Sequence, residues 1–467
     1  MAGVPSVKRD FFPLDEELEL VAGHFTPSVY EGVTRLASWM PFGQAAKEAG
    51  YFLHVTLSEA TVRRQSEAVG AAYVALQTRE VERIEKGESP KVDAGVHQQF
   101  LSVDGAFVPL VGGEWAEVKT LAIGTVEPAR EVKGEMVVKT GDLTYFSRLA
   151  EASTFQRLAL VETHRRGLNQ SEAVGAVTDG SEWCQGFIDY HRPDAVRILD
   201  FPHAAEYVAT ISQTAFAQNE TTAKTWLTEQ LHQLKHDGPL PVLAAAQVLA
   251  CTVPDQPELA KALAYLLKRQ DHMAYPLFQA DGWPIGDGAV ESANKLVVEA
   301  RLKGSGMHWA QAHVNPMLAL RNMACNDRWS EAWPLICAEL RRQTAQRSAA
   351  RAQRRHARSH PASPPLCTPP QPAIPRPYQP AHSQLNPLRL TYPKRLIVHP
   401  LLIPGGNPFS FLPSSRPLVL NPVKNFDGHP PLSCALILPS LCGRMGSFAC
   451  TPRVYDKQRD RNSIHER

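Results

Sequence analysis

Three acidic residues lie in predicted core elements, and together they could hold metal ions. Asp104 lies in the middle of the apolar stretch FLSVDGAFVPL, Asp179 ends a short buried strand, and Glu291 lies on a helix in IGDGAVESANKLV. A buried carboxylate without a partner is costly, so a cation would explain the position of Asp104. Carboxylate oxygens suit Mg²⁺ or Mn²⁺, and a pair of such ions can clamp the attacking and leaving oxygens of a phosphoryl displacement.

Each acid taken alone also has a purely structural explanation. Asp104 and Asp179 both precede glycine, and Asp-Gly usually starts a turn. Asp287 could cap the helix that carries Glu291. Two carboxylates ~4 Å apart repel each other by ~4 kcal/mol at an effective dielectric constant of about 20, so a cluster of three needs a compensating cation. Spacing alone leaves both interpretations open.

The composition is that of a globular protein with room for about three domains. The 467 residues are 43% hydrophobic and 21% charged, and the start, MAGVPSVKRDFF, lacks the apolar run of a signal peptide. No apolar run approaches the ~20 residues of a membrane span. The eight cysteines form no C-x-x-C pair, so neither a zinc site nor a disulfide framework is indicated. A cytoplasmic protein with reduced thiols is expected.

The charge is unevenly divided along the chain. Residues 340–426 hold thirteen Lys or Arg and no acid, and residues 427–467 hold six basic and four acidic residues. The net charge of +2 for the whole chain therefore leaves residues 1–339 with −13. An acidic core argues against a protein that coats nucleic acid, and it fits carboxylates that gather around metal ions. The segment 341–358 contains seven arginines, and prolines are frequent beyond residue 360. This composition predicts a disordered tail over residues 340–467.

Residues 1–95 are predicted to be helical. Within them, residues 41–70 suggest two short helices that are separated by a turn, with Ser58 as the N-cap of the second. Arg63 and Arg64 would point outward from that second helix. The pattern fits a DNA-binding helix-turn-helix, and it fits a plain helical hairpin equally well.

The centre of the chain alternates between strands and helices. Residues 99–140 read as three consecutive strands with Gly-containing turns, followed by a helix over residues 145–167. A strand that ends at Asp179 and the stretch AVRILDFPHAAEYVATI then repeat a strand-to-helix plan. This order predicts an α/β layer with a mixed sheet. Residues 204–280 are predicted to be all helical, and residues 287–302 form one more helix.

Several stretches carry a resemblance to a known family. SVDGA, VTDGSEW, DFPHAAEYV, YPLFQADGWPIGDGAVESANKLVVEARLKGSGMHW and the lead-in FFPLDEELEL resemble bacterial insertion-sequence transposases of the ISKra group, within the Mutator-like superfamily. The resemblance extends from about residue 11 to about residue 333. The chain departs from the family at His308, where an arginine is expected, and before FFPLDE, where relatives carry a Cys-rich segment.

The resemblance implies an RNase H-like catalytic domain with a helical insertion before the glutamate. It makes Asp104, Asp179 and Glu291 the catalytic acids and the ligands of two Mg²⁺ or Mn²⁺ ions, with Asp104 bridging both. The helical stretch 204–280 falls where the family has its insertion.

Asp200 and His203, in DFPH, match an acid-x-x-His motif of the superfamily near the active site. The alternative is an N-cap followed by a first-turn histidine. Trp309 could stack on a flipped base, or it could belong to the core. Both interpretations remain open for each of these residues.

Further polar side chains follow Glu291 on the same predicted helix. Asn294, Lys295 and Arg301 recur at helical spacing after Glu291 and could contact DNA phosphates. A solvated basic helix face is the alternative.

The sequence predicts a DNA transposase. A water activated between the two ions would attack the phosphodiester at an element end, and the freed 3′-hydroxyl would attack target DNA. The alternatives are an RNase H-like nuclease that cleaves without joining, and an inactive remnant that binds DNA through residues 41–70. Expected partners are double-stranded DNA at element ends and target, and further copies of the chain on DNA. A bacterial cytoplasmic, nucleoid-associated location without membrane contact is expected.

The expected organisation has five parts. They are a helical N-terminal region with a candidate helix-turn-helix (1–95), the first part of the catalytic core (96–203), the helical insertion (204–280), the second part of the core with the Glu helix (281–339) and the tail (340–467).

Overall fold

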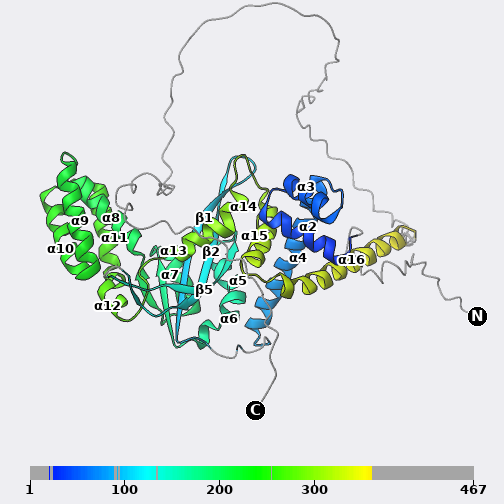
Figure 1. Cartoon of the computed structure of the whole chain (residues 1–467), viewed down its shortest axis with the longest axis horizontal. Helices are drawn as coiled ribbons and strands as arrows, with labels where there is room; N and C mark the ends of the chain where they lie inside the picture. Colours follow the sequence, from blue (N-terminus) through cyan, green and yellow to red (C-terminus); the bar gives the residue numbers. More distant parts are fainter. Residues whose placement is uncertain are drawn as a thin grey trace, which may run out of the picture. The chain divides into compact units, whose positions relative to one another are not determined.

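The computed structural model describes residues 25–88, 95–132, 135–253 and 255–359, together with Leu20 and Val92. Within these residues, helices surround a five-stranded sheet (Figure 1). Its strands are β1 (Gln98–Pro109), β2 (Trp115–Val126), β5 (Thr140–Arg148), β6 (Ala173–Thr178) and β7 (Val196–Leu199), in the order β5-β2-β1-β6-β7. β5, β2 and β1 pair antiparallel, while β6 pairs parallel with both β1 and β7. The predicted α/β class with a mixed sheet is confirmed.

The helices of the described residues come before, between and after these strands. They are α2 (Pro27–Trp39), α3 (Phe42–Leu53), α4 (Glu59–Glu85), α5 (Ala152–Leu158), α6 (Leu160–Arg165), α7 (Glu182–His191), α8 (Phe201–Ala215), α9 (Glu220–His236), α10 (Pro239–Thr252), α11 (Pro257–Lys268), α12 (Tyr275–Ala280), α13 (Gly288–Ala293), α14 (Ala300–Leu302), α15 (Gln311–Cys325) and α16 (Trp329–Ser359). Two 3-10 turns, η1 (Leu168–Gln170) and η2 (Gln270–Met273), and the π-helix η3 (Asn294–Glu299) accompany them.

The central strand β1 has two differently covered faces, because successive residues of a strand point to opposite sides. Leu101 and Val103 are buried in a cluster with residues of α5 and α7. Ala106 and Val108 are buried on the other face, in a cluster with residues of η3 and α15. Asp104 has the parity of this second group and so points to the face that the segment from α13 to α14 covers.

The predicted position of the third strand is wrong. The stretch GEMVVKT contributes β4 (Glu135–Val137), which pairs only with β3 (Arg130–Val132), and the third strand of the sheet is β5. The helix predicted over residues 145–167 therefore begins at Ala152. Phe146 is a buried strand residue that contacts Phe155 across the core. Its apolar neighbours fit a strand as well as a helix, and burial against the sheet decides between the two.

The N-terminal region is helical in its described part, as predicted. Ser58 is the N-cap of α4, since its hydroxyl accepts a hydrogen bond from the Thr61 backbone N–H at 3.2 Å. Arg63 and Arg64 are exposed, as expected. The second helix of the predicted pair is not short, however, because α4 has 27 residues. Packing accounts for this length, because Val69 of α4 is buried in the same cluster as residues of α15 and α16.

The all-helical stretch predicted over residues 204–280 is confirmed. It corresponds to most of α8 together with α9, α10, α11, η2 and α12. These helices share one buried cluster with β6 and β7, which includes Val208, Leu234, Leu259, Leu263, Leu266, Val177 and Ile198. This helical stretch is therefore packed directly on one edge of the sheet.

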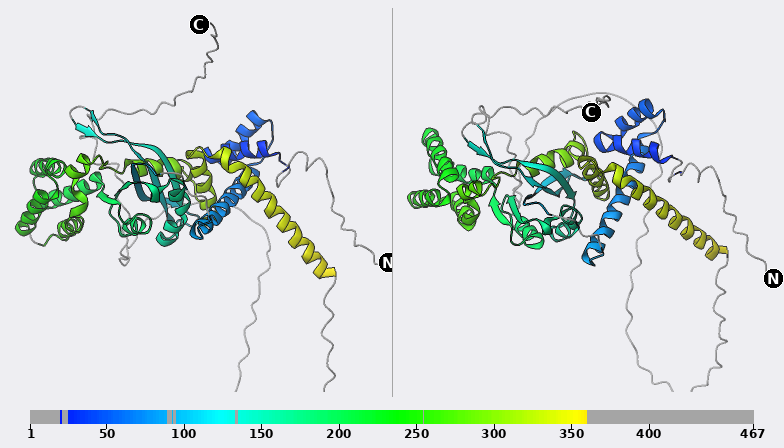
Figure 2. Two further views of the ribbon diagram at one scale, coloured as in Figure 1. Left: turned by 90° about the horizontal axis from the view of Figure 1, so that it is seen from below. Right: turned by 60° about the horizontal axis from the view of Figure 1, so that its bottom comes forward.

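The boundary predicted at residue 340 is wrong. Leu340 is buried in the core, and α16 continues as a helix to Ser359. Figures 1 and 2 show α16, in yellow, extending as a single helix beyond its contacts with α4. The rest of the predicted tail, from residue 360, lies outside the described residues, as do residues 1–19.

In the part of the chain that the structure describes, no helix is both long and apolar enough to cross a membrane. Four cysteines in this part, Cys184, Cys251, Cys325 and Cys337, form no disulfide bond.

Candidate active site

Asp104 lies in the middle of β1, where it pairs with Thr120 of β2. The interpretation of Asp104 as a turn residue is therefore wrong. Its carboxylate oxygen Oδ2 accepts a hydrogen bond of 2.8 Å from the side-chain amide of Asn294, the first residue of η3. The backbone N–H of Gly105 also hydrogen-bonds this carboxylate. The strand thus presents Asp104 directly to the helical segment that follows Glu291.

The surroundings of Asp104 disfavour the ionised form of its carboxyl group. Burial raises the pKa of Asp104 to about 7, and the negative charges of Asp179 and Glu291 add to this shift. Coulombic interactions of this kind act between groups that lie near one another. The three acids that the sequence singled out, which are separated by 75 and 112 residues in the chain, therefore belong to one electrostatic cluster.

Asp179 directly follows β6 in a turn that residues of the helical stretch 204–280 hold in place. Its Oδ1 accepts a hydrogen bond from the Ser181 backbone N–H at 2.8 Å, so the Asp-Gly turn is real. Gly180 adopts φ +74°, a conformation that favours glycine. The Tyr265 hydroxyl of α11 donates to the Asp179 carbonyl oxygen. Buried Arg269, which directly follows α11, donates two hydrogen bonds, of 2.9 and 2.6 Å, to the Gly180 carbonyl oxygen. Asp179 therefore belongs both to the Asp-Gly turn and to the cluster of acids.

Glu291 lies in α13 and is the most accessible of the three acids. Its side chain is 52% exposed, and the Lys295 ammonium group lies 3.9 Å from its Oε2. Asp287 occupies the N-cap position of α13 but makes no side-chain cap hydrogen bond. The capping interpretation of Asp287 is therefore wrong.

Asp287 and Asp200 form a second acidic pair beside the first three acids. Asp200 accepts hydrogen bonds from the backbone N–H groups of His203, at 2.8 Å, and of Asp287, at 2.9 Å. Burial raises the pKa of both carboxyl groups, and a side-chain hydrogen bond between them adds to the shift of Asp287. The charges of Asp104 and Glu291 also raise the pKa of Asp287. The cluster thus contains five acids from four segments.

The helix that carries Glu291 changes to a π-helix at Asn294. Segments of this kind are rare and are frequently found at functional sites. Arg321 of α15, which is fully buried, donates to the carbonyl oxygens of Leu296 and Val297 within the π-helix and, at 3.0 Å, to that of Ser38 in α2. A buried guanidinium group therefore stabilises the irregular backbone that directs Asn294 toward the acids.

The donor atoms of this cluster fit a divalent oxygen-binding cation. Its acids repel one another when ionised, and the amide oxygen of Asn294, next to Asp104, is buried without a hydrogen-bond partner. An uncompensated buried acceptor is costly and is satisfied by a cation or a water. Among the described residues, no three His, Cys, Asp or Glu side chains converge on one point where they could hold a metal ion. Binding would therefore require the carboxylates to turn toward a shared ion.

Two of the expected auxiliary residues lie beside the cluster. His203 occupies the first turn of α8, where Asp200 is the N-cap, so the capping interpretation of DFPH is confirmed. The His203 ring lies edge-on to Tyr207 and Tyr265. Lys295 is exposed next to Glu291 and remains available to a ligand.

Arg301 and Trp309 lie in the interior. Arg301 is 2% exposed, donates to the Ala37 carbonyl oxygen at 2.9 Å and lies against the rings of Phe42 and Trp309. Trp309 donates through its indole N–H to the Leu302 carbonyl oxygen at 3.0 Å. The core interpretation of Trp309 is confirmed, and Arg301 connects α14 to the end of α2 rather than lying at the surface.

Sequence reasoning missed the roles of Asn294, Arg269 and Arg321. Asn294 was expected at a phosphate, yet it contacts Asp104. Glu291 and Asn294 are three residues apart, a spacing that places two helical residues on one face, and this was the available signal. No local sequence pattern predicts the roles of Arg269 and Arg321, because their partners are backbone carbonyl groups far away in the chain.

Asn294→Ala is expected to weaken divalent metal binding by ~10–100-fold, the scale on which groups that orient metal ligands act. Stability is expected to fall by at most about 1–3 kcal/mol, because the buried Asp104 carboxylate loses one donor while one unsatisfied buried oxygen is removed. Mn²⁺ binding titrations of the two proteins measure the effect. Ser292→Ala, at an exposed position of the same helix, is the matched control. Unchanged Mn²⁺ affinity in Asn294→Ala would show that this amide does not serve the site.

Neither a family model nor a curated protein matches the chain. The arrangement of the acids is therefore the basis for any assignment of function.

Proposed function

We propose that the chain is a metal-dependent DNA transposase of the RNase H-like class. The observation that carries the proposal is the electrostatic cluster of Asp104, Asp179 and Glu291, three acids that come from a central strand, the end of its parallel neighbour and a helix over the same face. The strand order, with three antiparallel strands followed by two parallel ones, supports the RNase H-like assignment.

In this proposal Asp104, Asp179 and Glu291 hold two Mg²⁺ or Mn²⁺ ions. When bound, such ions stabilise the charge that develops on a phosphodiester under attack. Asn294 orients the Asp104 carboxylate, and Tyr265 with Arg269 fixes the turn that carries Asp179. Lys295, exposed beside Glu291, is placed to contact a DNA phosphate. The protein thus supplies a negatively charged site, whose carboxylates would turn toward the ions, and one exposed ammonium group.

The expected substrates are double-stranded element ends and target DNA, which copies of the chain would bring together as an oligomer. Two reactions follow: hydrolysis at the element end, and attack of the freed 3′-hydroxyl on a target phosphodiester. Both are displacements at phosphorus and can use the same acids in turn.

The test supplies purified protein with Mg²⁺ and duplexes that carry the terminal sequences of the element. The expected result is a nick at the terminal phosphate, followed by covalent joining to a second DNA, both resolved on denaturing gels. The variant Glu291→Gln is expected to give neither product. Nicking without joining would replace the proposal with a nuclease, and binding without nicking would indicate an inactive DNA-binding protein.

A further inference from the structure

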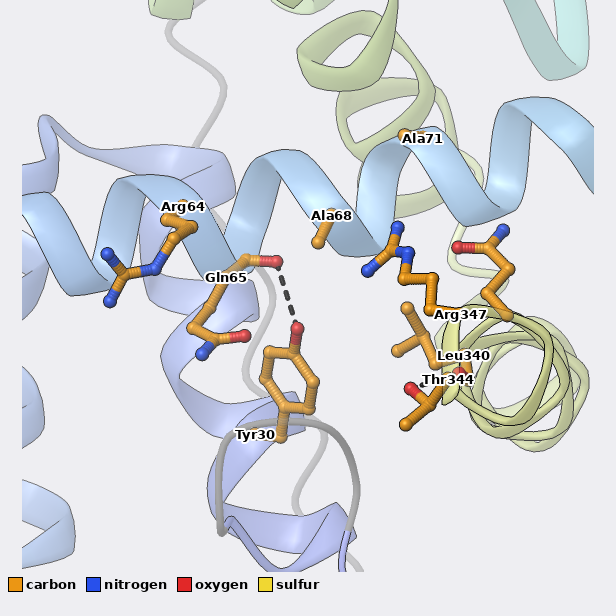
Figure 3. Close-up of a pocket in the computed structure, with 9 residues that line it drawn as sticks. Tyr30, Arg64, Gln65, Ala68, Ala71, Leu340, Thr344 and Arg347 are labelled. Atoms are coloured by element: carbon orange, nitrogen blue, oxygen red, sulfur yellow. Dashed lines mark hydrogen bonds between the residues drawn. The ribbon is translucent and has the colours of Figure 1, made fainter. Parts of the chain in front are cut away.

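A groove lies between α4 and α16, away from the acidic cluster. Figure 3 shows Gln65 and Ala68 of α4 opposite Leu340 and Thr344 of α16, with Tyr30 of α2 below them. The Tyr30 hydroxyl donates to the Gln65 carbonyl oxygen at 3.2 Å and closes the floor. The groove has a volume of about 250 Å³, and its lining is completed by Arg64, Ala71, Gln343 and Arg347. The lining therefore combines apolar and polar side chains with two arginines, and no acid is among the described residues that line it.

The two arginines of the groove have free guanidinium groups. Within the described residues, neither Arg64 nor Arg347 forms an ion pair or a hydrogen bond, and both are exposed. The acid nearest along α16, Glu339, is already engaged by Arg79 and Arg342. Free guanidinium groups that flank a groove without acids favour an anionic ligand, and their planar forks match phosphate.

The basic face continues past the groove along α16. Arg351 and Arg354 follow Arg347 at i+4 and i+7, so the three lie on one stripe of the helix. At a rise of 1.5 Å per residue, the stripe extends ~10 Å beyond the groove. No acid occurs in this helix after Glu339. Like charges at i, i+4 repel one another, and a polyanion with regularly spaced charges relieves that repulsion.

We propose that the groove between α4 and α16, together with the arginine stripe that extends from it, is a binding track for the phosphate backbone of duplex DNA. Arg64 contributes from the start of α4, and Arg347 begins the stripe. The contacts fix the position of the duplex without reading bases, so binding is independent of sequence. The choice of DNA over other polyanions rests on the proposed function.

The test is the salt dependence of DNA binding by the full chain, measured by fluorescence anisotropy with a labelled duplex of random sequence. In Arg64→Gln/Arg347→Gln, the slope of log affinity against log salt is expected to become shallower by ~1.8, at ~0.9 for each lost phosphate contact. The variant Arg351→Gln/Arg354→Gln is expected to give a loss of similar size. Melting temperatures should match the parent, since these side chains are exposed.

The matched control is Arg157→Gln/Arg165→Gln, which removes the same charge from exposed arginines of α5 and α6. Its slope is expected to equal that of the parent. A groove variant with the control's slope overturns the inference, and if the parent still cuts and joins DNA, the proposed function stands. A shallower slope in the groove variant supports the binding track even if the parent never cuts DNA. In that case the proposed function is wrong, but the inference about the track holds.

Discussion

Replacing Asp104 with Asn is expected to leave the metal-free protein at least as stable as the parent while lowering DNA cleavage by at least ~100–1000-fold, the scale of one lost preorganised electrostatic contact. In the parent, burial and the charges of Asp179 and Glu291 oppose ionisation of Asp104. Asn keeps the shape and can accept the same hydrogen bond from Asn294, but it carries no charge. If the Asp104 carboxylate stabilised the fold instead, the Asp104→Asn variant would be less stable than the parent.

The stability gain of Asp104→Asn should depend on pH. The pKa of Asp104 rises from its ordinary 3.8 to about 7 in the folded protein, so between these values the folded parent holds more protons than the unfolded chain. Stability of the parent therefore falls as pH rises through this window. The advantage of the Asn variant should be absent below pH ~4 and reach a plateau of at most ~4 kcal/mol above pH ~7.

Urea denaturation at a series of pH values, with the metal chelated, measures this difference. Asp189→Asn is the matched control, because Asp189 is an exposed acid whose partner is Arg197. It should change stability by less than ~1 kcal/mol, show no such window and leave cleavage intact. Asp104→Asn that is less stable than the parent at every pH would contradict the account.

Arg328→Met is expected to lower the free energy of unfolding by ~3–5 kcal/mol, the cost of leaving a buried charge without its partner. Glu162 of α6 is 2% exposed and accepts hydrogen bonds from Arg328, at 2.7 Å, and from the Thr144 hydroxyl, at 2.6 Å. Arg328 lies between α15 and α16, so the pair joins these helices to α6 and β5. Removing the guanidinium group leaves the buried Glu162 carboxylate without its positively charged partner.

Urea denaturation of Arg328→Met, with and without Glu162→Gln, separates the ion pair from simple loss of packing. The double variant should recover part of the lost stability, because the buried group is then neutral. Arg165→Gln, which breaks the exposed pair of Arg165 with Glu331, should cost less than ~1 kcal/mol. A double variant as unstable as Arg328→Met alone would mean that the buried charge is not the cause.

The sequence predicted elements best where apolar residues form a continuous run or recur at helical spacing. β1 and β2 were located as largely apolar stretches bounded by Gly-containing turns, and the helical stretch 204–280 was located from leucines at helical spacing. The third strand was misplaced because the apolar residues around Phe146 satisfy both periods, and only packing against β2 selects the strand. The helical part of the arginine-rich segment was missed because composition alone suggested disorder. Its Ala, Arg and Gln residues favour helix, and the buried first turns of α16 supply the nucleus.

The candidate site was only partly predictable. Asp104 stood out as a charge within an apolar strand, and its electrostatic link to Asp179 and Glu291 is present in the structure. The contact of Asn294 with Asp104 depends on the π-helix, whose carbonyl groups are held by Arg321 from a distant helix. Such long-range hydrogen bonds leave no periodic trace in the sequence, so no local pattern could reveal them.

The most direct test of the account is Mn²⁺ binding, followed through the electron paramagnetic resonance signal of the free ion, with and without duplex DNA. The parent is expected to bind two Mn²⁺ ions per chain, as a two-metal site requires, and Asp104→Asn is expected to lose at least one of them. A parent protein that binds no Mn²⁺, with DNA or without it, would contradict the central claim that these acids form a metal centre.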